Sequence, residues 1–109
     1  MEYFATKLSF LRQKQKISLN VANRQILLAF TDNGVFALKD KCPHMGSMIS
    51  TGTLVDGIIT CKFHGLPISV ETGEVTSKAK ADFLKLDEFS MTVRKYKVII
   101  REDNVYIDI

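Results

Sequence analysis

Four residues constrain this chain more than any others: its only two cysteines and its only two histidines, which stand in two short motifs. The first is Cys-Pro-His at residues 42–44, and the second is Cys-Lys-Phe-His at residues 61–64. Between them lies Asp56-Gly57, a dipeptide typical of a tight two-residue hairpin turn. We expect this hairpin to bring the two motifs face to face.

The residue types of the two motifs leave four interpretations open. In the first interpretation, Cys42 and Cys61 are small buried apolar side chains beside ordinary histidines. A disulfide between them would not persist in a reducing compartment and leaves the histidines without a role. Two thiolates and two imidazoles also suit zinc, although zinc fingers usually pair Cys with Cys and His with His. The fourth interpretation is an iron–sulfur cluster with mixed ligands.

Composition narrows the class of protein. The chain has 109 residues, of which 46% are hydrophobic and 25% charged, as in an ordinary globular domain, and no linker divides it, so we expect one domain over residues 1–109. No apolar run approaches the roughly 18 residues of a membrane span. Charged residues interrupt the first 19 residues, which therefore lack the apolar core of a secretory signal, and we expect a cytoplasmic protein. The net charge of +3 comes from scattered basic residues, a distribution that argues against nucleic-acid binding.

The pattern along the chain is typical of short strands. Apolar and polar residues alternate over 17–21, and turn signals separate apolar β-compatible runs at 25–30, 35–38, 53–55, 58–60, 68–71, 92–101 and 105–109. One segment differs: Ala79, Phe83, Leu86 and Phe89 recur at the helical spacing of three and four, which predicts a short helix with these side chains toward a core. The sequence predicts an all-β protein with one small helix.

The two motifs resemble the signature of the Rieske family. The resemblance rests on Cys-Pro-His-Met-Gly at 42–46, on the sixteen residues between His44 and Cys61, and on Cys-Lys-Phe-His-Gly at 61–65. It extends to 34–38, 72–74, 96–98 and 105–107, and so covers most of the chain from about Ile17 onward. It implies a small antiparallel β-sandwich with a cluster-binding subdomain of two loops at about 40–72.

The resemblance also implies a cofactor and a role. It assigns one [2Fe–2S] cluster to Cys42, His44, Cys61 and His64, with the two thiolates on one iron and the two imidazoles on the other. The implied function is electron transfer, as a monomeric, non-catalytic carrier between a reductase donor and an oxygenase or reductase acceptor. The alternatives are a small subunit or redox-sensing module of a larger reductase, such as a nitrite reductase, and a zinc-stabilised interaction domain.

Departures from the family refine this expectation. High-potential members carry a disulfide beside the cluster and two hydroxyl groups that donate hydrogen bonds toward cluster sulfurs. The matching positions here are Ser47 and Phe63 for the disulfide, and Leu66 and Ile68 for the hydroxyl groups. The resemblance therefore implies the low-potential, ferredoxin type. The usual proline-containing cover of the cluster is altered, because the only prolines are in or beside the two motifs, and an insertion of about ten residues holds the expected helix.

Overall fold

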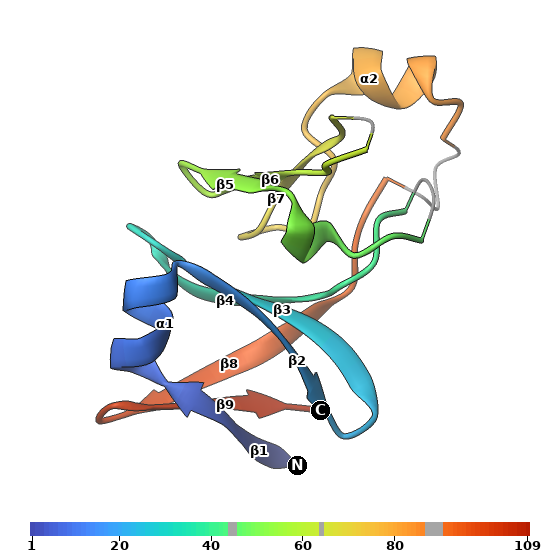
Figure 1. Cartoon of the computed structure of the whole chain (residues 1–109). Coiled ribbons are helices and arrows are strands. Elements are labelled where there is room, and N and C mark those ends of the chain that lie inside the picture. Colours follow the sequence, from blue (N-terminus) through green and yellow to red (C-terminus); the bar gives the residue numbers. More distant parts are fainter. Residues whose placement is uncertain (44–45, 64, 87–90) are drawn as a thin grey trace.

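The computed structural model describes residues 1–43, 46–63, 65–86 and 91–109, which form two antiparallel sheets and short helices (Figure 1). The strands in these ranges are β1 (Glu2–Lys7), β2 (Lys16–Val21), β3 (Arg24–Thr31), β4 (Gly34–Lys39), β5 (Thr53–Val55), β6 (Ile58–Thr60), β7 (Pro67–Ser69), β8 (Lys95–Arg101) and β9 (Asn104–Asp108). The helices are α1 (Leu8–Lys14), the 3-10 helix η1 (Ile49–Thr51) and α2 (Lys78–Phe83). The all-β prediction is confirmed.

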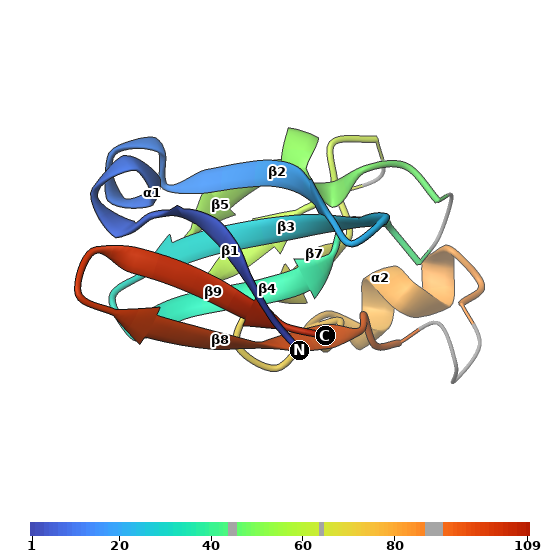
Figure 2. The ribbon, with the colours of Figure 1, turned by 90° about the horizontal axis from the view of Figure 1, so that it is seen from below.

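Six of these strands form the larger sheet, in the order β1-β9-β8-β4-β3-β2, and each neighbouring pair is antiparallel. The sheet curls, so that its two edge strands, β1 and β2, contact each other, and Figure 2 shows β1 between β2 and β9. An apolar core fills the curl; its fully buried members include Leu11, Ile26, Leu28, Val105 and Ile107.

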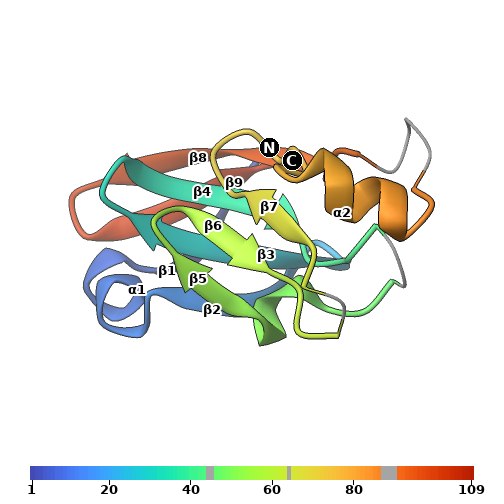
Figure 3. The same cartoon turned by 90° about the horizontal axis from the view of Figure 1, so that it is seen from above.

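The smaller sheet, β5-β6-β7, lies over one face of the larger one (Figure 3). A second apolar core joins the two sheets, with Leu27 and Leu38 from below and Ile59 and Ile68 from above. This arrangement explains the continuous buried run of β3: successive side chains point to opposite faces of a strand, so Leu27 enters one core and Leu28 the other.

The hairpin between β5 and β6 has the predicted boundaries. Asp56 and Gly57 both have positive φ values, 50° and 78°, as the two central residues of a type I′ turn require. Val55 pairs with Ile58 across this turn, and β6 pairs with β7 on its other side. The hairpin thus returns the chain to the end of the molecule where the first motif lies.

The helix predicted over 79–89 is shorter in the structure, and the face that it packs against the core is not the predicted one. It begins after Ser77, whose side chain accepts a hydrogen bond from the Lys80 N–H at 3.1 Å, and ends at Phe83. Ala81 is its buried residue, whereas Phe83 is 77% exposed, so the prediction that Phe83 packs in the core is wrong. The helical period stops after less than two turns, and Leu84 and Leu86 beyond it pack against the second core instead. Phe89 lies outside the described residues.

Two elements near the N-terminus were not predicted from the sequence. Strand β1 pairs with β9, about one hundred positions away, and Arg101 on β8 donates to the Glu2 carboxylate at 2.5 Å, which lowers the pKa of Glu2. Helix α1 buries only Leu11. Within the described ranges, none of the helices has the length and apolar character that crossing a membrane requires.

Candidate metal centre

The first motif opens a loop that is closed by two backbone hydrogen bonds. The Cys42 N–H donates to the Ser47 carbonyl oxygen at 2.6 Å, and the Gly46 N–H donates back to the Cys42 carbonyl oxygen at 2.8 Å. Gly46 has a φ of 74°, in the left-handed region that glycine adopts without strain. The backbone therefore turns back sharply four residues after the cysteine.

The second motif opens a loop with the same pattern. The Cys61 N–H donates to the Leu66 carbonyl oxygen, and the Gly65 N–H donates to the Cys61 carbonyl oxygen, both at 2.9 Å. Gly65 has a φ of 67° and, like Gly46, stands four positions after its cysteine. Two segments remote in sequence thus share the same hydrogen bonds and the same glycine conformation among their described residues.

The two cysteines lie on the inner side of these loops. Each is only 2% exposed, and both belong to the apolar core that joins the two sheets. The Ser47 hydroxyl of the first loop lies 3.9 Å from the Cys61 sulfur of the second, so the two loops meet at this contact. Buried thiols at the meeting point of two glycine-turned loops are a suitable donor set for a thiophilic metal or cluster.

A close backbone approach holds the second loop near the first. Gly52 ends the 3-10 helix that follows the first loop, and a Cβ on this residue would lie 1.9 Å from the Thr60 carbonyl oxygen. Any larger side chain would push the chain away from Thr60, the residue before Cys61. The need for glycine at 52 follows from a distant partner, and the sequence analysis missed it.

Asp40 anchors the start of the first loop and was also missed. Its side chain, only 4% exposed, accepts hydrogen bonds from the Ser18 hydroxyl at 2.5 Å and from the Ser50 N–H at 2.8 Å. The carboxylate therefore ties β2 and η1 to the residue two positions before Cys42. Its position directly after β4 is the only local signal.

Lysine side chains lie against both glycine turns. A Cβ on Gly46 would be 3.1 Å from the Lys41 Cε, and a Cβ on Gly65 would be 3.7 Å from the Nζ of Lys80 on α2. Two cations therefore lie beside the loops. Phe63, between the ligand positions of the second motif, is 62% exposed, so the second loop also presents an apolar side chain to solvent.

The two predicted histidine ligands, His44 and His64, lie outside the described residues. Their neighbours are described: Pro43 precedes His44, and Gly65 follows His64. The structure thus brings together the two loops from which all four predicted ligands come. The assignment of these four residues as ligands stays a prediction.

A comparison with family models decides the identity of the domain, since the Rieske [2Fe-2S] domain matches residues 1–96. The chain belongs to the Rieske family. This Rieske chain is 29% identical over 85 residues to the 3-phenylpropionate/cinnamic acid dioxygenase ferredoxin subunit of Photorhabdus laumondii, a match that covers 77% of this chain and 72% of that protein. It is 37% identical over 76 residues to mouse apoptosis-inducing factor 3, covering 69% of this chain and 12% of the relative.

Solved structures share the fold. The ferredoxin of carbazole 1,9a-dioxygenase from Nocardioides aromaticivorans superimposes with a TM-score of 0.81 at 17% identity, over 98% of this chain and 96% of that one. Three of the curated relatives are much longer, and the chain spans only 9–13% of their lengths. This Rieske domain binds a [2Fe–2S] cluster.

Proposed function

We propose that the protein is a ferredoxin component that carries electrons to a partner oxidoreductase, with its cluster held by Cys42, His44, Cys61 and His64. The proposal rests above all on the matched hydrogen bonds of the loops that begin at Cys42 and Cys61. The similarity to a dioxygenase ferredoxin subunit over 72% of that subunit's length supports the role of a carrier.

The donor set suits such a carrier. With two thiolates and two neutral imidazoles, the bound cluster accepts and returns one electron at a higher potential than a four-cysteine cluster, because fewer anionic ligands oppose the added charge. Cys42 and Cys61 lie in the core and would hold one iron, while His44 and His64 would hold the other. The chain's part is to exclude water from the thiolates and to fix the spacing of the loops.

A second candidate follows from the length of other relatives. The chain corresponds to 12% of apoptosis-inducing factor 3, so a domain of this kind also occurs within a much larger protein. In that case the chain would be a small subunit or redox-sensing module of a larger reductase. The two candidates differ in their stable association with a large partner, and neither requires a catalytic site of the chain's own.

Electron transfer in trans distinguishes them. We expect the purified protein to mediate electron flow from an NADH-dependent flavin reductase to cytochrome c, and to migrate on gel filtration of its native cell extract at its own size of about 12 kDa. Cys42→Ser and Cys61→Ser should abolish the visible absorbance and the mediated flow, because each removes a thiolate ligand. Lys97→Ala, on a distant strand, is the control.

Comigration with a large partner, together with no mediated flow, would instead favour the subunit. Cysteine variants that keep the wild-type spectrum and iron content would refute the ligand assignment.

A further inference from the structure

A groove lined by basic side chains lies directly beside the first loop. Its volume is about 400 Å³, and among the described residues that line it Asp40 is the single acidic one. The basic residues of this groove, all exposed, are Arg24, Lys39, Lys41 and Arg94; we refer to it as the basic groove. The ion pairs identified among the described residues join the Met1 amino group to Asp108 and Arg101 to Glu2. They do not involve the four basic side chains of the groove.

The cations of the basic groove stand on rigid strand ends. The Lys39 N–H donates to the Arg94 carbonyl oxygen at 2.8 Å, and the Asp40 N–H donates to the Gln25 carbonyl oxygen at 3.0 Å, which joins β4 to the segment before β8 and to β3. The Arg94 guanidinium lies 5.2 Å above the Tyr96 ring, in cation–π contact. The backbone that carries the cations is therefore held in place, and the Arg94 guanidinium packs on the Tyr96 ring.

The basic groove reaches the cluster-binding loop itself. Lys41 directly precedes Cys42, and its side chain runs along Gly46, which also lines the groove. Met48, 40% exposed, lies on the same wall just after the loop. A protein bound in the groove would contact Lys41, Gly46 and Met48, and so would lie beside the first loop.

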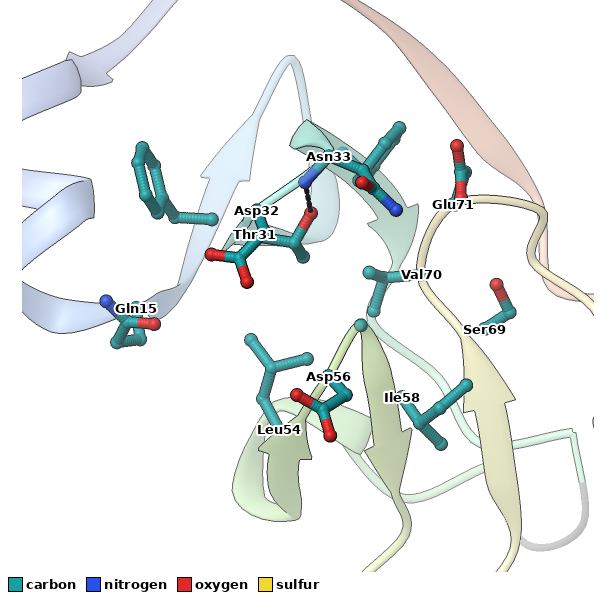
Figure 4. Close-up of a pocket in the computed structure, with 13 residues that line it drawn as sticks. Gln15, Thr31, Asp32, Asn33, Leu54, Asp56, Ile58, Ser69, Val70 and Glu71 are labelled. Carbon is teal, nitrogen blue, oxygen red and sulfur yellow. Dashed lines mark hydrogen bonds between the residues drawn. The ribbon is translucent and has the colours of Figure 1, made fainter.

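The groove at the other end of β3 differs in charge from the basic groove. A second groove of about 510 Å³ between the β3–β4 turn and the β5–β6 turn is lined by Asp32, Asp56 and Glu71, and by neither lysine nor arginine among the described residues (Figure 4). Arg24 begins β3 and Asp32 follows its end, so the two grooves are separated by the length of this strand, roughly 25 Å at 3.3 Å per residue. The groove beside the first loop is therefore basic, whereas the groove at the other end of β3 is acidic.

We propose that the basic groove is the docking surface for a redox partner protein whose docking face is acidic. The inference rests on the proposed function and specifies its partner by charge. A concentration of positive charge beside the first loop attracts an acidic surface to this loop during approach, and such steering raises association rates by about 10-fold to 1000-fold at low salt. Nucleic acid fits the groove less well, because its one aromatic lining residue, Tyr96, is only 9% exposed and offers no platform for bases.

Charge reversal in the basic groove tests this inference. The probe is the hydroquinone of an acidic flavodoxin, which gives one electron to the oxidised protein and becomes the semiquinone, followed by stopped flow. In Arg24→Glu/Arg94→Glu we expect the second-order rate at low ionic strength to fall at least 10-fold and its decrease with salt to disappear. Arg12→Glu/Lys14→Glu, exposed residues on α1 with the same change in net charge, should stay within about 2-fold of the wild type.

Equal losses in both double variants would overturn the inference, because net charge alone would then explain the rate; so would an unchanged rate in the groove variant. Inhibition of the wild type by phosphate at fixed ionic strength would indicate a small-anion site. Binding of a DNA duplex at physiological salt that depends on the groove residues would indicate a nucleic-acid site. Either result would also overturn the inference. If the groove variant lacks cluster, Arg24→Gln/Arg94→Gln takes its place, with a smaller loss expected. Wild-type protein without a cluster would refute the proposed function itself, before any variant is compared.

Discussion

At the scale of single residues, the predicted site depends on features that the sequence shows directly. Both motifs place a glycine four positions after a cysteine, and in the structure both glycines adopt a positive φ and donate to the cysteine carbonyl oxygen. Glycine adopts this conformation without strain, so the residue type at Gly46 and Gly65 fits the turn that the backbone makes there. Gly52 escaped notice, because its requirement comes from the Thr60 carbonyl oxygen and not from its own neighbours.

Three side chains near the cysteines bear on the reduction potential of the cluster: Leu66, Ile68 and Ser47. Leu66 and Ile68, at the positions where high-potential relatives have hydroxyl groups, are fully buried in the same core as the cysteines. The potential is therefore expected toward the lower end of the roughly −150 to +300 mV range of Rieske centres. Ser47, however, places a hydroxyl 3.9 Å from the Cys61 sulfur, where it can donate to the thiolate.

Ser47→Ala should lower the midpoint potential. The hydrogen bond becomes stronger when the reduced centre carries more negative charge, and a difference of about 1 kcal/mol corresponds to roughly 40 mV for one electron. At the observed distance we expect a decrease of about 10–40 mV by protein-film voltammetry. Ser47→Thr retains the hydroxyl and should stay close to the wild type. Equal decreases in both variants would show that packing, and not the hydrogen bond, sets the difference.

At the scale of secondary-structure elements, local signals were reliable and long-range ones were not. The β5–β6 hairpin was predicted to the residue, because the dipeptide Asp56-Gly57 favours a type I′ turn. Strand β1 was missed because its partner is β9, and α1 because seven residues with one buried leucine show no period. Helix α2 was predicted too long, because Leu86 and Phe89 extend the apolar pattern of the sequence beyond Phe83, where the helix ends.

Asp40 connects three elements, and its removal should loosen the first loop. Asp40→Ala leaves the Ser18 hydroxyl and the part-buried Ser50 N–H without their acceptor, which costs about 1–3 kcal/mol. We expect the visible absorbance to be lost at a lower urea concentration than in the wild type. In a double-mutant cycle, Ser18→Ala should cost less in the Asp40→Ala background than in the wild type. Strict additivity would contradict a direct interaction between these two side chains.

At the scale of the whole molecule, the two sheets support the two loops that begin at Cys42 and Cys61. The core between the sheets contains both cysteines, and the strand ends beneath them carry the cations of the basic groove. The net charge is +3, and in the sequence the basic residues are scattered. Arg24, Lys39 and Arg94 meet only because the sheet places β3, β4 and the start of β8 side by side. Charge that is scattered along the chain is thus gathered by the fold.

The central claim is that one [2Fe–2S] cluster is bound by two cysteines and two histidines. Pulsed electron paramagnetic resonance of the anaerobically purified, reduced protein, with iron and sulfide determined on the same sample, tests it most directly. We predict two irons and two inorganic sulfides per chain and a Rieske-type signal with hyperfine coupling to two histidine nitrogens. Stoichiometric zinc without sulfide, or a [2Fe–2S] signal without nitrogen coupling, would contradict the account.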